Sequence, residues 1–285
     1  MIGHKRIEAV KQAVIKAVQE TASQRVSLVA AGCAFYAILA LFPSITMLIS
    51  VYGLAFNPHT VQPQLHYLEG LMPPDVYLLI SERIQGLVSQ PVKGLGLSFL
   101  ISLLISLWSS STGTKSVLNA LTLAYGETET RGFIRFHLVS LGMTFLAMLG
   151  VIVAIAFMVL LPIVMAHIGA HIRLPENMNF WIGFISFLVM VCFIVIALGL
   201  LYRFGPAGDG RVFFVPGAAV ATLAWLATSW AFGVYVGRFA AYSATYGPLA
   251  TLIGLMMWFY ISAYVVLFGA HLNAALDQQR KVLAA

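Results

Sequence analysis

The residues best able to hold a ligand form a row of hydroxyls that leads to a lysine. Ser98, Ser102, Ser106 and Ser109 recur at spacings of three or four, which places them on one face of a helix. Such a face can line a groove through which a polar headgroup passes without full desolvation. It can instead hold helices together, because small residues let two backbones approach closely. The spacing leaves both interpretations open.

Basic groups and a histidine lie near the same predicted membrane surface. Lys115 follows the serine row, and its long side chain can reach the surface or contact an anionic headgroup or solute. Arg131, Arg135 and Arg203 come from nearby connections and can join it in one basic cluster. His271 lies near the end of the last apolar segment. A lone histidine there is commonly structural, although histidine also titrates near neutral pH.

Proline and glycine mark three apolar segments. Pro43 falls within the first, Pro216 and Gly217 interrupt the fifth, and Gly247 and Pro248 open the sixth. Proline lacks a backbone donor and can kink a helix. These positions are candidate hinges for a transporter that opens alternately to its two sides. They can also be kinks that serve packing alone.

Signatures of soluble enzymes are absent from the sequence. It contains no P-loop, no G-x-S-x-G nucleophile turn and no dense histidine and aspartate run for two catalytic metals. Cys33 and Cys192 lie in apolar runs, where a structural disulfide is not expected. We therefore expect no enzymatic activity, no cofactor, no metal site and no nucleic-acid partner.

The elements that carry these residues are predicted from composition. Of the 285 residues, 60% are hydrophobic and 9% are charged, whereas a soluble domain has about 25% charged residues. This predicts an all-α integral membrane protein, in which each spanning helix needs about 20 mostly apolar residues. Six segments qualify, at 27–53, 95–121, 135–162, 180–202, 212–237 and 246–275. We expect a single polytopic membrane domain over residues 1–285.

Two regions outside the spans are also expected to contain helices. Residues 1–24 predict a basic amphipathic helix, lying either on an anionic membrane surface or on the protein's own cytoplasmic face. The connection 54–94 contains five prolines and predicts an extracytoplasmic elbow with an amphipathic interfacial helix. A lid over a cavity is the alternative. Every aspartate and glutamate falls outside the six spans, which weighs against a classical ion-coupled antiporter.

The distribution of basic residues predicts the orientation. Eleven lysines and arginines fall in the two tails and in the loops after the second and fourth spans, with Lys115 close to the same side. Four fall on the opposite side, namely Arg83, Lys93, Arg173 and Arg238. Because basic residues gather on cytoplasmic loops, both termini are expected in the cytoplasm.

Motifs spread over nearly the whole chain support a family resemblance. They are Ala31-Gly32-Cys33-Ala34-Phe35-Tyr36-Ala37 with Leu41-Phe42-Pro43, Trp108-Ser109, Leu118-Asn119-Ala120, Tyr125-Gly126, Tyr202-Arg203-Phe204-Gly205-Pro206, Val215-Pro216-Gly217-Ala218, Tyr246-Gly247-Pro248-Leu249, Trp258-Phe259-Tyr260 and Gly269-Ala270-His271-Leu272-Asn273-Ala274. In combination, from about residue 20 onward, the chain resembles the YihY/BrkB family of bacterial membrane proteins. His271 departs from the pattern, because the family usually has glutamate there.

The resemblance implies a multi-pass protein of the bacterial inner membrane with six helices. It adds Tyr36, Asn119, Tyr246 and Asn273 to the candidate substrate contacts, beside the serine row, Lys115, Arg203 and His271. Some members of the family carry a ribonuclease label, which the residues of this chain do not support.

Our leading hypothesis is an inner-membrane transporter or flippase that moves an amphipathic, anionic lipid or solute. Membrane lipids are the expected partners, and a homo-oligomer is compatible with the sequence. An ion or small-solute transporter or channel is one alternative. A membrane scaffold that transports nothing is another.

Overall fold

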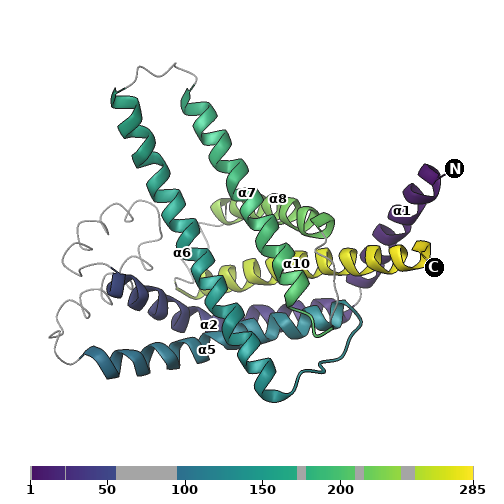
Figure 1. Cartoon of the computed structure of the whole chain (residues 1–285), viewed down its shortest axis with the longest axis horizontal. Coiled ribbons are helices and arrows are strands. Elements are labelled where there is room, and N and C mark those ends of the chain that lie inside the picture. The colour runs from purple at the N-terminus through teal and green to yellow at the C-terminus, as the bar shows by residue number, and fades with distance from the viewer. Residues whose placement is uncertain are drawn as a thin grey trace.

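The computed structural model describes residues 2–22, 24–55, 95–171, 178–208, 215–238 and 248–284. Every regular element in these ranges is an α-helix, which confirms the predicted all-α class (Figure 1). The helices are α1 (Ile2–Thr21), α2 (Gln24–Ala55), α5 (Leu95–Ala124), α6 (Phe133–His171), α7 (Met178–Phe204), α8 (Val215–Arg238) and α10 (Pro248–Ala284). Nearly all of the predicted elbow, together with Tyr246 and Gly247, lies outside the described residues.

Five of the helices are long and apolar enough to cross a membrane: α2, α6, α7, α8 and α10. Helix α5, which covers the predicted span 95–121, is not among them. The side chains described in α5 lie mostly in its second half, where serines, threonines and Lys115 alternate with apolar residues. The count of six spans therefore stays a prediction, as does the orientation.

The helices form two groups that differ in direction. Helices α2 and α5 run alongside one another, and α10 packs against α2, α5 and α8. Helices α6 and α7 form a hairpin that leaves this group at a steep angle (Figure 1). The hairpin is attached where α6 contacts α5 and α7 contacts α8.

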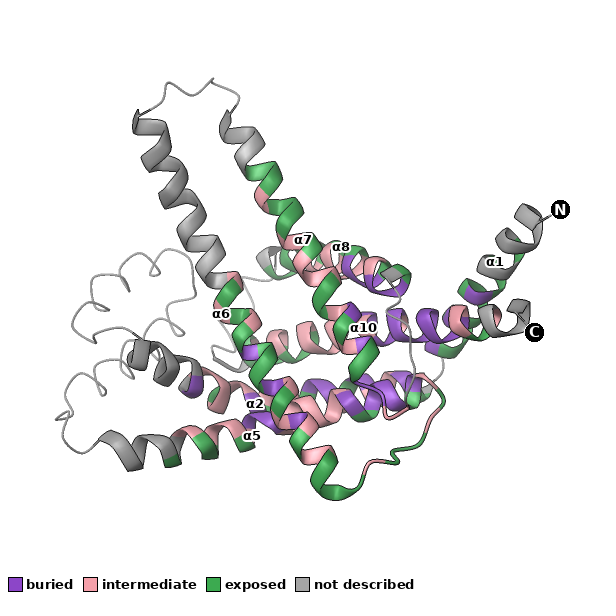
Figure 2. Cartoon of the chain, in the orientation of Figure 1, coloured by how far each residue is buried: buried purple, intermediate pink, exposed green. Residues whose placement is uncertain are grey.

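The core lies toward the end of the molecule that carries α1 and the end of α10. Its residues are mostly small or aliphatic: Val26, Ala30, Cys33, Ala120, Leu121, Ala124, Tyr202, Ala218, Leu267 and Ala270. Figure 2 shows the buried positions gathered in the corresponding parts of α2, α5 and α10. Large apolar side chains such as Phe145 on α6 and Phe187 on α7 are exposed, as expected where lipid covers a helix.

Two of the predicted hinge prolines begin a helix. Pro216 is the second residue of α8 and Pro248 the first of α10, whereas the sequence placed Pro216 inside a span. A proline is tolerated in the first turn because its missing N–H would have no intrahelical partner there. Pro43 lies within α2, which continues to Ala55. Motion at these positions stays a prediction.

Candidate functional site

Helices α8 and α10 approach closely where α8 begins. The amide of Gly217 donates a hydrogen bond to Asn273 Oδ1 over 2.9 Å, and the Asn273 side chain satisfies one of the orphan donors of the first turn. Asn273 is 1% exposed. A Cβ atom added at Gly217 would lie 2.5 Å from Asn273 Oδ1, and one added at Gly269 would lie 2.6 Å from the Ala221 Cβ. Gly217 and Asn273 therefore hold two helices together.

A second junction ties the loop after α5 to the end of α7. Gly126, with φ of +69°, terminates α5, as glycine commonly does in the left-handed conformation. Glu127 Oε2 then accepts a hydrogen bond from the Gly208 amide over 2.7 Å. Arg131 Nη2 donates to the Gly205 carbonyl over 3.1 Å. We call residues 125–132 with 205–208 the loop clasp.

An ion pair within the loop clasp fixes the arginine. Arg131 Nη2 and Glu129 Oε2 are 2.7 Å apart, and the arginine side chain is 6% exposed. The hydrogen bonds from Arg131 hold the pKa of Glu129 below its usual range, because they favour the charged carboxylate. The guanidinium of Arg131 thus makes its contacts inside the loop clasp. Arg135 and Arg203 are exposed, and the Arg203 guanidinium lies over the Phe204 ring.

The N-terminal helix docks on α10 through His271. Its Nδ1 lies 3.1 Å from Glu20 Oε2 of α1, and Tyr264 Oη donates to the Thr21 carbonyl over 2.7 Å. Ala13 and Ala17, which form a face of small residues on α1, are buried. Helix α1 packs against α10, while its apolar residues Val14 and Val18 are exposed, so both interpretations of residues 1–24 stay predictions.

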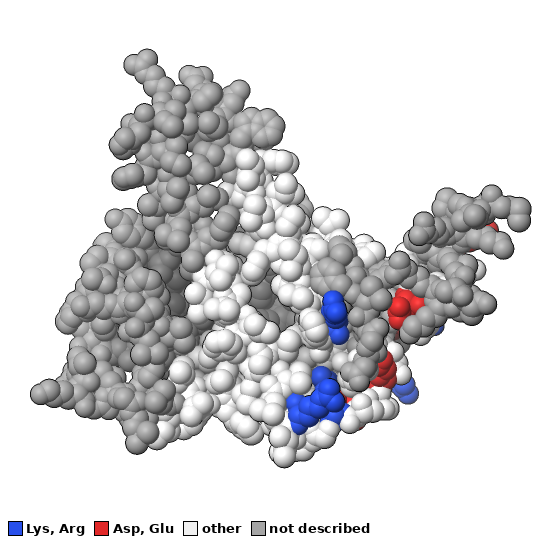
Figure 3. Space-filling model, viewed as in Figure 1, with Lys and Arg blue, Asp and Glu red and all other residues white. Residues whose placement is uncertain are grey.

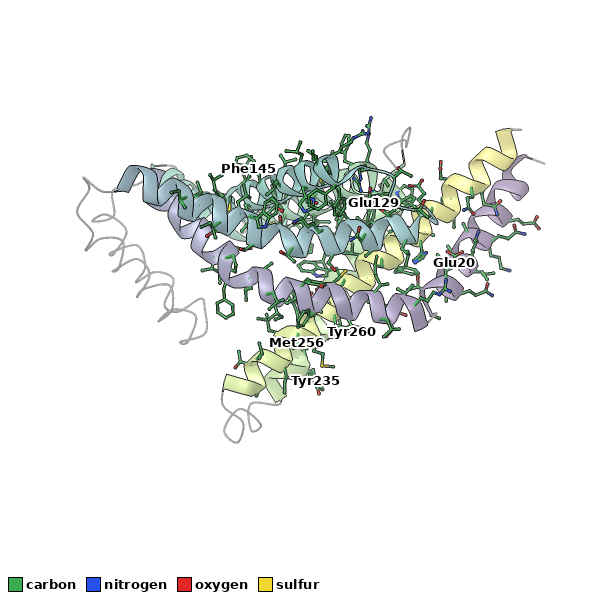
Figure 4. The ribbon with its side chains drawn as sticks, turned by 90° about the horizontal axis from the view of Figure 1, so that it is seen from below. Glu20, Glu129, Phe145, Tyr235, Met256 and Tyr260 are labelled. Atoms are coloured by element: carbon green, nitrogen blue, oxygen red, sulfur yellow. The ribbon has the colours of Figure 1, made fainter. Side chains whose placement is uncertain are left out.

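The pairing of His271 with Glu20 was missed by the sequence reasoning. The predicted spans contain no carboxylate. Nothing in the sequence indicated that a neighbouring helix would place a carboxylate beside a residue of a span. Figure 4 shows Glu20 and Glu129 toward the end that holds both termini, with Phe145 farther away along the molecule. In the part of the surface visible in Figure 3, the described charged side chains gather toward that same end.

The serine row lies on the side of α5 that packs against α2. Ser110 and Ser44 share a hydrogen bond of 2.5 Å, and Ser116 Oγ donates to Cys33 Sγ over 3.5 Å. Ser106 and Ser109 lie near this contact and are half-buried. The side chains of Ser98 and Ser102 lie outside the described ones. Hydroxyls here do connect helices, as the packing interpretation requires, and a role in binding is still a prediction.

Lys115 lies on another side of α5, beside an aromatic cluster. Its Nζ is 4.7 Å from the centroid of the Trp108 ring. The imidazole of His137 on α6 stacks on the same indole with centroids 5.3 Å apart. Asn119 is exposed one turn beyond Lys115. Sequence reasoning missed His137, although its place at the start of a predicted span, two residues after Arg135, was a usable signal.

Two other features complete the inventory of sites. Tyr36 is exposed on α2 and packs edge-on against Phe35. Within the described residues, no group of three or more histidine, cysteine, aspartate or glutamate side chains is arranged to hold a metal ion.

Comparison with known proteins places these features in a family. The sequence profile described as virulence factor BrkB matches residues 17–284. The putative ribonuclease-like protein YfkH of Bacillus subtilis is 31% identical over 261 residues, covering 88% of this chain and 90% of that protein. A UPF0761 membrane protein of Ralstonia nicotianae is 26% identical over 250 residues, covering 82% of this chain. The chain spans only 53% of the Ralstonia protein's length.

A shorter match and the apolar helices agree with this assignment. A UPF0761 membrane protein of Xanthomonas oryzae is 38% identical over 82 residues, which are 28% of this chain and 19% of that protein. No solved structure matches the chain. The membrane-protein relatives and the five apolar helices support a multi-pass membrane protein. With the profile match over nearly its whole length and the Bacillus relative, the chain belongs to the virulence factor BrkB family.

Proposed function

We propose that this protein is an inner-membrane transporter that moves an anionic, amphipathic lipid or solute across the bilayer. The observation that carries the proposal is the position of Lys115. Lys115 is half-buried on α5, and its ammonium group lies over the Trp108 ring. Among the described residues, no carboxylate lies within ion-pair distance of it. A cation in a membrane helix is costly unless a partner or water compensates it, and an anionic substrate group supplies that partner.

The polarity of α5 agrees with this proposal. The helix packs against α2, α6 and α10, while Ser106 and Ser109 keep part of their surface exposed. A hydroxyl-bearing face within a membrane bundle lowers the cost of moving a polar headgroup past it. The prolines at the start of α8 and α10 are the candidate pivots.

The proposal contains no chemical step. The name of the Bacillus relative describes that protein as ribonuclease-like. We expect the purified chain to leave RNA intact. RNA cleavage that copurifies with the folded protein and disappears when it is unfolded would contradict this part of the proposal.

Reconstitution tests the transport itself. Purified protein is placed in vesicles that contain fluorophore-labelled phosphatidylglycerol or phosphatidylcholine, and a reductant that cannot cross the bilayer reports which labels reach the outer leaflet. We expect faster crossing of the anionic lipid than in protein-free vesicles. Lys115→Gln should slow that crossing, whereas the exposed α1 variant Lys11→Gln should not. If no lipid crosses faster than in protein-free vesicles, the lipid proposal fails. An ionic current would favour the channel alternative.

A further inference from the structure

We propose that Trp108, Lys115 and Asn119 of α5, with His137 of α6, form a binding site for the phosphate headgroup of an anionic phospholipid drawn from the surrounding bilayer. The inference rests on the proposed function for the anionic class of substrate. It adds where the lipid binds and which part of the lipid each side chain contacts.

The register of α5 puts the three residues in one stripe. Trp108 and Lys115 are seven residues apart and Asn119 is four further on, and these spacings return to the same side of a helix. The stripe faces away from α2, which α5 meets through Ser110 and Ser116. Trp108 is 53% exposed, so the stripe lies on the outer surface of the described protein.

The same stripe changes from apolar to polar along the helix. Ile101 and Leu104 continue it on the far side of Trp108 and are exposed apolar residues. Lys115 and Asn119 continue it on the near side with a cation and an amide. An apolar track that ends in an indole and then a cation has the order of a phospholipid, in which acyl chains lead to a glycerol and a phosphate. Indole rings favour this boundary between hydrocarbon and headgroup.

Helix α6 supplies a second polar group at the headgroup end. The Phe133 carbonyl lies 2.8 Å from His137 Nδ1, and because a carbonyl only accepts, Nδ1 must carry the proton in that hydrogen bond. The bond and the stacking on Trp108 fix the ring. Nε2 has no hydrogen-bond partner among the described residues. It is therefore the nitrogen left to accept a hydrogen bond from a headgroup hydroxyl, or to donate one to a phosphate oxygen when the ring carries both protons.

The local charges favour an anion over a cation. Arg135 is exposed on the first turn of α6. The two acidic residues of the preceding loop are engaged in the loop clasp, Glu127 with the Gly208 amide and Glu129 with Arg131. The ammonium of Lys115 thus remains without a carboxylate partner among the described residues.

A membrane lipid fits better than a soluble anion because apolar surface surrounds the site. Phe133, Ile134 and Leu138 on α6 are largely exposed, as are Ile101 and Leu104 on α5. Acyl chains would cover these side chains, which a free phosphate ion would leave bare.

Lipid retention measured by native mass spectrometry tests the site. The protein is released from nanodiscs of matched acyl composition that contain phosphatidylglycerol or phosphatidylcholine. We expect preferential retention of phosphatidylglycerol and a loss of about tenfold in Lys115→Gln, because a hydrogen bond to a charged group contributes enough for a factor of this size. Lys115→Arg should keep the retention, and Lys11→Gln is the matched control.

His137→Phe keeps an aromatic ring against Trp108 but removes Nε2, so it tests the site even if the lysine variant fails to fold. Equal retention of phosphatidylglycerol by wild type, Lys115→Gln and His137→Phe overturns the inference. So does glycerol phosphate binding as tightly as the whole lipid. Retention that depends on these residues, with no transport of any lipid, refutes the proposed function but supports the site. Transport that survives the loss of retention supports the site but refutes the part of the proposed function that rests on Lys115.

Discussion

The close approach of α8 and α10 makes a quantitative prediction about two glycines. A Cβ atom at Gly217 would lie 2.4 Å from the Gly269 carbonyl oxygen, and one at Gly269 would lie 2.7 Å from the Gly217 carbonyl oxygen. Ordinary carbon–oxygen contacts fall near 3.3–3.6 Å, a range typical of helix interfaces. Because both obstacles are backbone atoms, the two helices must separate by about 1 Å if either glycine becomes alanine.

The expected loss of stability follows from two contributions. Overpacking of this kind costs about 1–3 kcal/mol. Separation of the helices also stretches the buried hydrogen bond from the Gly217 amide to Asn273, and a buried group left without its partner costs about 1–3 kcal/mol. We therefore expect Gly217→Ala to destabilise the protein by roughly 2–6 kcal/mol.

The matched controls are glycines on the same two helices. Gly233 on α8 and Gly254 on α10 have no atom within 4 Å of an added Cβ, so alanine there should be neutral or stabilise by up to about 1 kcal/mol. Thermal unfolding of the purified variants in one detergent, at one scan rate, gives the comparison. If Gly217→Ala and Gly269→Ala unfold at the same temperature as Gly233→Ala and Gly254→Ala, the argument from close packing is refuted.

Three further predictions concern the end that holds both termini. Arg131 holds the pKa of Glu129 below its usual range, so the stabilisation by this ion pair is present above the unfolded pKa of about 4.3 and is lost as the pH falls through the lower folded value. Limited proteolysis should therefore find the loop clasp of the wild-type protein protected at about pH 5. The loop clasp of Arg131→Gln should be open to the protease even at neutral pH. His271→Glu places a second carboxylate against Glu20, which lies 3.1 Å from the histidine; like charges repel, so α1 should lose hydrogen-exchange protection and regain it on adding Glu20→Gln. A reporter that is active only outside the cytoplasm, fused after the last residue, should be inactive.

Each of these three has an outcome that contradicts it. Unchanged proteolysis of Arg131→Gln would mean that the ion pair does not secure the loop. Undiminished protection of α1 in His271→Glu, or a loss that Glu20→Gln does not restore, would separate the docking of α1 from this contact. An active reporter would reverse the predicted orientation.

Much of the architecture could be predicted from the sequence because it depends on local properties. Long apolar runs specify helices in a membrane, where every backbone group must be satisfied within its own segment. The predicted spans accordingly fall within α2, α5, α6 and α7 and overlap α8 and α10. Helix α5 shows where this reasoning stops. The run is helical, but its polarity left open whether lipid or protein surrounds it.

The contacts of the candidate site depend on distances between helices, which no local sequence pattern specifies. Periodicity correctly placed four serines on one face of α5, yet only the packing of α2 on that side showed what the face meets. The pairing of Glu20 with His271 joins residues 251 positions apart. The stacking of Trp108 on His137 likewise needs the particular crossing of α5 and α6. Sequence determines which side chains share a face of a helix, whereas the partner of each face is decided by how whole helices pack, since that depends on every contact along both surfaces at once.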